Sequence, residues 1–279
     1  MRRALKPTET ILSALMPTTD LIAEGEGFHT PSLVDFFPPA ILFEGTPFEF
    51  TRVNMIQVLM TVAIATLFIL AFRRPQVVPR GLQNIGELAV NFVQTYVIDS
   101  IMGEKGRRYL PYLVTLFFFI LALNLAGIVP GLNLAGTSVV AVPAMLAVIS
   151  WLVFNIAGIR KHGFGQYMKV NLFPPGVPIP VYILLTPIEF LSTFILRPIT
   201  LTIRLLANMM AGHLMLVLFF AGAHYLLLEA DWILRPLGLG AAAMGLGVTA
   251  FEILISVLQA YIFTLLTALY IAGAESESH

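Results

Sequence analysis

Two arginines, Arg197 and Arg204, interrupt an apolar stretch from Phe194 to His213, FILRPITLTIRLLANMMAGH, that otherwise has the composition of a membrane helix. An arginine at the centre of such a helix costs about 2.5 to 3.5 kcal/mol on insertion scales. The guanidinium keeps its proton at every accessible pH, so it cannot avoid this cost by becoming neutral. Arg204 must therefore face protein, water or an anion, and a charge in this position indicates an ion pathway.

The composition extends this interpretation to the whole chain. Of 279 residues, 58% are hydrophobic and 11% are charged, and the mean hydropathy is +0.87. These values are typical of a multi-pass membrane protein. Sixteen basic residues balance sixteen acidic ones, so the net charge gives no information about nucleic-acid or acidic partners. We predict no nucleic-acid partner. The absence of cysteine excludes disulfides, thiolate metal sites and cysteine nucleophiles.

The hydropathy pattern predicts an all-α polytopic membrane protein. Three ordinary transmembrane spans are expected at about 54–72, 109–129 and 139–159, each with roughly the 20 apolar residues that a bilayer requires. Between residues 81 and 102, apolar and polar side chains separate onto two sides. That pattern is typical of an amphipathic helix lying in the membrane surface. A C-terminal hairpin of two long, steeply tilted helices, 181–274, completes the expected fold.

Basic residues predict the orientation, because cytoplasmic loops carry an excess of lysine and arginine. The loop at 130–138 has no charge. Two other loops are strongly basic, through Arg73, Arg74, Arg80, Lys105, Arg107, Arg108, Arg160, Lys161 and Lys169. We therefore expect an extracytoplasmic N-terminal segment (1–53), a membrane domain (54–274) and a cytoplasmic tail (275–279).

The apolar segment 181–228 is too long for an ordinary span. As one helix it would be roughly 72 Å long, against a hydrocarbon core of about 30 Å. Crossing once would need a tilt near 65°, outside the usual range of about 0–40°. Two shorter spans are the competing solution; we favour one inclined arm with kinks near its prolines. Small residues from Gly238 to Gly247 predict close packing of the second arm against the first.

Polar residues recur on particular faces of the two arms. On the first arm, Asn208 lies one turn beyond Arg204. His213 lies about 13 Å further along the axis than Arg204 and roughly 180° around it, so the two face different surroundings. On the second arm one face carries three polar side chains, Glu252, Ser256 and Gln259.

Each of these residues also has an ordinary structural explanation. Arg197 precedes a proline, so its side chain could extend to the headgroup region. Arg204 could form a structural ion pair with Glu189 or Glu252, and Glu252 could instead hydrogen-bond His213. The asparagine and the glutamine could simply link the two helices. The presence of arginine, histidine, glutamate and glutamine together in one apolar hairpin nevertheless favours an ion path.

Histidine and a buried carboxylate are suited to carrying protons. Because imidazole changes charge near neutral pH, His213 can load and unload a proton. Arg204 has no proton to give, so its possible role is electrostatic: to hold an opposing carboxylate ionised and to block direct passage. The chain has neither a P-loop nor a His-Glu-x-x-His motif. We therefore predict no nucleotide chemistry, no metal and no cofactor in this chain.

Three segments resemble subunit a of F-type ATP synthases. The run from Arg197 to His213 resembles the family's arginine signature. Residues 251–263, FEILISVLQAYIF, resemble its last long helix, and residues 124–130, NLAGIVP, resemble the end of its second span. The resemblance covers roughly residues 54–274. It implies the same fold and orientation that the hydropathy and charge patterns predict.

The resemblance also implies roles for individual residues. Arg204 would face the carboxylate of a rotating c-ring, with Gln259 opposite it on the other arm and Asn208 nearby. His213 and Glu252 would line the half-channel from the outside. Many bacterial members carry these two residues in exchanged order, which suggests that they act as one pair. Further candidates are Glu189, Arg197, Ser256 and Tyr270.

The implied protein is the stator subunit of a rotary ATP synthase in the plasma (inner) membrane of a bacterium. Its expected partners are the c-ring, the subunit b stalk, the remainder of the F-type complex and membrane lipid. Two other classes stay open. A secondary transporter or redox-linked pump subunit would work without a rotor, and an intramembrane metalloprotease would bind zinc.

Overall fold

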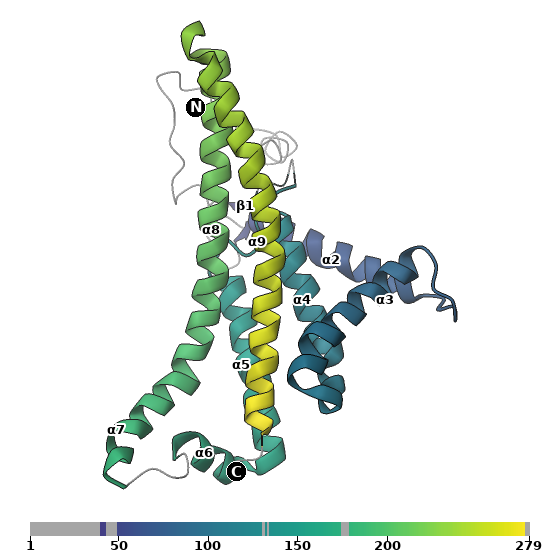
Figure 1. Cartoon of the computed structure of the whole chain (residues 1–279), viewed down its shortest axis with the longest axis vertical. Helices are drawn as coiled ribbons and strands as arrows, with labels where there is room; N and C mark the ends of the chain where they lie inside the picture. The colour runs from purple at the N-terminus through teal and green to yellow at the C-terminus, as the bar shows by residue number, and fades with distance from the viewer. Residues whose placement is uncertain (1–39, 43–48, 130–131, 133, 174–178, 277–279) are drawn as a thin grey trace, which may run out of the picture. The chain divides into compact units, whose positions relative to one another are not determined.

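The computed structural model describes residues 40–42, 49–129, 132, 134–173 and 179–276 (Figure 1). Most of the expected N-terminal segment and the last residues of the expected tail therefore lie outside the described residues. In the described parts of the chain, five helices are long and apolar enough to cross a membrane. The predicted all-α class is confirmed.

The chain divides into two compact units, and all the boundaries except the one between residues 139 and 140 fall inside helices. Unit 1 comprises residues 1–63, 121–139 and 207–257, and unit 2 comprises residues 64–120, 140–206 and 258–279. Each unit has its own apolar core. In unit 1 this core includes Val53, Ile56, Ala126 and Leu134. In unit 2 it includes Phe154, Ala157 and Ile271.

The predicted ordinary spans correspond to helices α2 (Arg52–Phe72), α4 (Leu110–Leu125) and α5 (Ala141–His162). A 3₁₀ helix, η3 (Gly103–Tyr109), leads directly into α4. Helix α5 ends at Gly163, whose φ of 78° lies in the region that favours glycine. The basic last turn of α5 suits the negative end of the helix dipole.

A small two-stranded antiparallel sheet precedes α2 and was not predicted. Strand β1 (Ala40–Leu42) pairs with β2 (Phe50–Thr51). Within unit 1, two side-chain hydrogen bonds also link α2 to the segment before α5. Gln57 Nε2 donates a hydrogen bond of 2.9 Å to the carbonyl oxygen of Gly136, and Arg52 donates one of 3.0 Å to that of Leu132.

The predicted amphipathic helix comprises α3 (Leu82–Val93) and a π-helical continuation, η2 (Gln94–Asp99). Its buried side is formed by Gln83, Gly86 and Val93, whereas the polar residues Asn84 and Asn91 are exposed. A β-carbon at Gly86 would lie 3.1 Å from that of Ala71, so α3 packs closely on the end of α2. Its apolar side is exposed through Leu82, Ile85, Leu88 and Tyr96.

The first long arm is one continuous helix, of which the 49 residues Val181–Glu229 form the candidate membrane span. It is built from α7 (Ile179–Phe190), the π-helical turns η4 (Leu191–Leu196) and η5 (Tyr225–Glu229), and α8 (Arg197–His224). Pro187 lies inside α7 and removes a backbone donor, and the π-helical turn η4 follows it. The helix axis bends between α7 and α8 (Figure 1).

The second arm begins with a 3₁₀ turn, η6 (Trp232–Leu234), and continues as the 41-residue helix α9 (Arg235–Glu275). Within unit 1 the two arms approach closely where the second arm has small residues. A β-carbon at Gly238 would lie 2.8 Å from Leu227, and one at Gly245 would lie 3.3 Å from Phe220. The small residues therefore serve helix packing at these two positions.

Within unit 2, the end of α9 is held by residues from two other elements, η3 and α5. Arg108 and Tyr109 both donate hydrogen bonds to the Glu275 carboxylate, and Lys161 donates one to the Glu275 carbonyl oxygen. Glu275, expected as the first residue of the tail, is the last residue of α9 and its side chain is largely buried.

Candidate functional site

Arg204 lies in the unit 2 part of α8, with its side chain exposed at the surface of the chain. The buried side of the same helix is formed by Leu201 and Leu205. The exposed side consists of Ile199, Thr200, Ile203 and Arg204, and together with Leu196 at the end of η4 we call it the α8 stripe. One permanent charge therefore stands in a nearly apolar exposed surface.

No described carboxylate of unit 2 forms an ion pair with Arg204, and this includes Glu189 of α7, which is half-buried. The structural ion pair between Arg204 and Glu189, which the sequence allowed, is therefore not formed within unit 2. Gln259, on the unit 2 part of α9, is buried. Asn208 is exposed and belongs to the unit 1 part of α8.

Unit 1 contains the buried histidine and the buried glutamate of the hairpin. The His213 residue of α8 is 6% exposed, and the Glu252 residue of α9 is 2% exposed. The two arms are close at this level, because a β-carbon on Gly212 would lie 3.1 Å from Oε1 of Glu252. The structure therefore holds both residues in the interior of one unit.

Three polar atoms near this point have no hydrogen-bond partner among the described residues. Both carboxylate oxygens of Glu252 and the Oγ of Ser256 are buried without a hydrogen bond to any described residue. Burying a polar group without a partner costs several kcal/mol in an apolar medium, and such groups are uncommon in folded proteins. A carboxylate in this position is unsuited to a purely structural role. It is suited to accepting and releasing a proton.

Unit 2 brings together two further candidates, Arg197 and Tyr270. The Arg197 Cζ lies 5.0 Å from the centroid of the Tyr270 ring and 5.9 Å from that of Phe154. Cation–π contacts of this kind contribute about 0.5–2 kcal/mol. The half-buried Arg197 side chain therefore packs on two aromatic rings within the protein.

Unit 2 also contains two pairs of hydrogen-bonded polar side chains that were not predicted from the sequence. Tyr112 and the Ser150 hydroxyl are 2.9 Å apart. The hydroxyl of Tyr167, on α6 (Phe164–Leu172), donates a hydrogen bond of 3.1 Å to the Asn155 side chain. Burial raises the pKa of Tyr167, although Arg197 opposes this by lowering it. The sequence signal that could have revealed these contacts was the presence of two polar residues, Ser150 and Asn155, within the third span.

Metal chemistry finds no support in the residues that the structure describes. Among them, no group of three or more histidine, aspartate or glutamate side chains comes together as a metal site would require.

Comparison with known proteins gives the family. Residues 54–272 match the family described as ATP synthase A chain. The chain is a member of this family. It is 47% identical over 245 residues to ATP synthase subunit a of Rhodococcus erythropolis, an alignment that covers 88% of this chain and 89% of the relative. It is 44% identical to the subunit a of a Parafrankia species, with 92% and 87% coverage.

The family resemblance seen in the sequence is thereby confirmed, and the matched residues nearly coincide with the predicted membrane domain. The subunit a family consists of proton-translocating membrane components of ATP synthases, not of their catalytic subunits. A more distant subunit a, from Hyphomonas neptunium, is still 41% identical over 227 residues.

Proposed function

We propose that this chain is the stator subunit of a bacterial F-type ATP synthase, where it provides two proton half-channels and the charge that separates them. The observation that carries this proposal is the exposed guanidinium of Arg204 within the apolar α8 stripe. Against lipid, such a charge would be costly. Against a partner that presents a carboxylate, the same charge is stabilised, and the stripe becomes an interface.

The proposed topology follows from charge and length. Helices α2, α4 and α5 cross the membrane, α3 lies in its surface with the apolar side toward lipid, and the two arms form an inclined hairpin. Residues 1–53 would lie outside the cell and residues 275–279 in the cytoplasm. The strongly basic loops and the exposed apolar side of α3 support this arrangement.

In the proposed mechanism, protons enter from outside past His213 and Glu252 and neutralise a carboxylate of the c-ring. The carboxylate oxygens of Glu252 and the neighbouring Ser256 hydroxyl support this route, because they are buried without a hydrogen-bond partner among the described residues. A neutral ring carboxylate can turn into lipid, whereas an ionised one could do so only at a high cost in free energy. After nearly a full turn, it would lose its proton to the cytoplasm through a second half-channel.

Arg204 would then meet the ionised carboxylate and prevent protons from passing directly between the half-channels. Asn208 and Gln259 would supply polar contacts beside it. The attraction must be moderate, because a tightly held carboxylate would stop the ring. Each charge that crosses a potential of about 100 mV supplies roughly 2.3 kcal/mol, so several protons are needed for each ATP.

The other candidates have supporting roles in this proposal. Arg197, stacked on Tyr270, would fix the position of α8 ahead of Arg204. Glu189 would lie near the start of the inclined arm. Nucleotide chemistry would belong to a partner subunit, because this chain has no P-loop. The c-ring and the subunit b stalk are the proposed direct partners.

Co-purification tests the proposal. The chain, carrying an affinity tag, is extracted from its own membranes in mild detergent, and the bound proteins are identified by mass spectrometry. We expect a ring of small hairpin proteolipids together with the remaining subunits of the complex. If the chain instead purifies alone and drives proton-coupled solute uptake in vesicles, it is a transporter and the proposal is wrong.

The close approach of the arms at Gly212 gives a separate prediction. In Gly212→Val the new side chain must displace the Glu252 carboxylate, so proton flux through the reconstituted complex is expected to fall at least tenfold. The matched control is Gly247→Val on α9, where a β-carbon meets nothing within 4 Å. Both changes carry the same intrinsic helix preference. Equal loss of flux in the two variants would contradict the role of the Gly212–Glu252 contact.

A further inference from the structure

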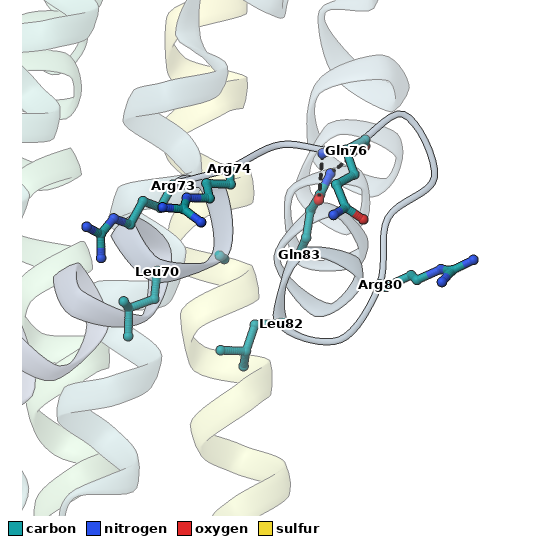
Figure 2. Close-up of a pocket in the computed structure, with 8 residues that line it drawn as sticks. Leu70, Arg73, Arg74, Gln76, Arg80, Leu82 and Gln83 are labelled. Atoms are coloured by element: carbon teal, nitrogen blue, oxygen red, sulfur yellow. Dashed lines mark hydrogen bonds between the residues drawn. The ribbon is translucent and has the colours of Figure 1, made fainter.

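A cavity of about 700 Å³ lies in unit 2, where the end of α2 meets the start of α3. Its lining combines three arginines with two leucines and one buried glutamine: Arg73, Arg74, Arg80, Leu70, Leu82 and Gln83. Figure 2 shows Arg73 and Arg74 next to each other at the end of α2, with Arg80 at the far end of the connecting loop and its side chain pointing away from them. None of these residues has a part in the proton path proposed above.

The cavity carries an excess of positive charge. All three arginines are exposed, and none forms an ion pair with a carboxylate in the described residues of unit 2. The nearby Glu87 carboxylate accepts a hydrogen bond of 2.8 Å from Gln83 Nε2. Arginine is the side chain best suited to bind phosphate, because its planar guanidinium can donate two parallel hydrogen bonds.

The shape of the cavity is set by hydrogen bonds. Gln83 Oε1 accepts a bond of 2.9 Å from the backbone N–H of Gln76, and Gln83 Nε2 donates one of 2.9 Å to the carbonyl oxygen of Gln76 (Figure 2). The close packing of Gly86 against Ala71 fixes α3 on the end of α2. The loop that carries the arginines is therefore held in place before any ligand binds, which reduces the entropic cost of binding.

An apolar surface adjoins the charged cavity. Leu70 and Leu82, at its edge, are half exposed, with 50% and 52% of their surface accessible. The exposed side of α3 continues this surface through Ile85 and Leu88. A free phosphate ion would use only the arginines. A phospholipid would use both surfaces, its phosphate on the arginines and its acyl chains along the leucines and α3.

We propose that this cavity binds the headgroup of an anionic phospholipid, with Arg73 and Arg74 as the main phosphate ligands and Arg80 adding to the positive potential. Basic residues at the membrane end of a helix are known to attract anionic lipid. The bound lipid would hold α3 in the membrane surface. The proposal rests on the membrane location of α2 and α3 in the proposed function, and is independent of Arg204.

Native mass spectrometry of the purified complex, with phosphatidylglycerol or phosphatidylcholine added to the detergent, tests the proposal. The double variant Arg73→Gln/Arg74→Gln is compared with the charge-matched Arg107→Gln/Arg160→Gln, whose arginines are exposed and lie outside the cavity. We expect wild type and control to bind phosphatidylglycerol in preference to phosphatidylcholine. The cavity variant should bind phosphatidylglycerol about 30-fold more weakly, with unchanged thermal stability and subunit composition.

Three results would overturn the proposal. Equal weakening in the control variant would indicate general charge attraction, and equal binding of phosphatidylcholine would exclude recognition of an anionic headgroup. Displacement of phosphatidylglycerol by millimolar inorganic phosphate would make free phosphate the ligand. None of these results would change which subunits co-purify, so failure of this proposal is distinguishable from failure of the proposed function.

Discussion

Replacing Arg204 with alanine is expected to abolish ATP synthesis driven by a proton gradient while allowing passive proton exchange through the membrane sector. Without the guanidinium, nothing holds the arriving ring carboxylate ionised between the half-channels. A charge pair at about 4 Å is worth about 4 kcal/mol at an effective dielectric constant of 20. That energy corresponds to roughly a thousandfold loss in the rate of coupled synthesis. Synthesis and proton leak are both measured in vesicles that contain the reconstituted complex.

The control removes the same side chain from another part of the hairpin. Arg235→Ala deletes an exposed guanidinium at the start of α9, outside the α8 stripe, and is expected to leave synthesis near the wild-type rate. Arg204→Lys keeps a charge and is expected to recover part of the activity. Near-normal synthesis in Arg204→Ala would reject the proposed role of this residue.

Exchanging the buried pair, His213→Glu with Glu252→His, is expected to restore proton flux that either single change removes. Each single variant leaves two identical groups in the relay, so flux should fall about 100-fold, the lower end of typical acid–base contributions. The double variant keeps one imidazole and one carboxylate in the interior of unit 1 and should recover at least tenfold over each single variant. Flux is measured from the quenching of a pH-sensitive dye in vesicles.

The hairpin offers a matched exchange outside the buried site. His224 Nδ1 lies 4.0 Å from Oε1 of Glu229 at the end of the first arm, and both side chains are about half exposed. Changing either residue alone, or exchanging the two, is expected to leave flux unchanged, because an exposed contact of this kind contributes little. If both single variants of the buried pair have wild-type flux, His213 and Glu252 do not form a relay.

Local sequence patterns predicted the helices well, for a physical reason. A membrane span needs about 20 apolar residues, and because these residues are consecutive, the span can be recognised from a local stretch of sequence. The long first arm was predicted as one inclined helix with kinks near its prolines, in preference to two shorter spans. The structure shows it as one helix, with a π-helical turn after Pro187. The strand pair before α2 has no comparable signal, because it joins short segments through backbone hydrogen bonds.

Contacts between distant segments could not be read from periodicity. The aromatic partners of Arg197 come from α5 and α9, and the residues that hold Glu275 come from segments more than 100 positions away in the sequence. Helical spacing placed His213 and Arg204 on different faces. It could not give the register between the two arms that puts Gly212 beside the Glu252 carboxylate.

The position of the Arg204 guanidinium in a cryo-electron-microscopy map of the assembled synthase is the most direct test of the account. We expect it to lie within about 4 Å of a ring carboxylate, the range of an ion pair. A guanidinium found in bulk solvent, or bound to a fixed carboxylate of its own chain such as Glu189 or Glu252, would contradict the account.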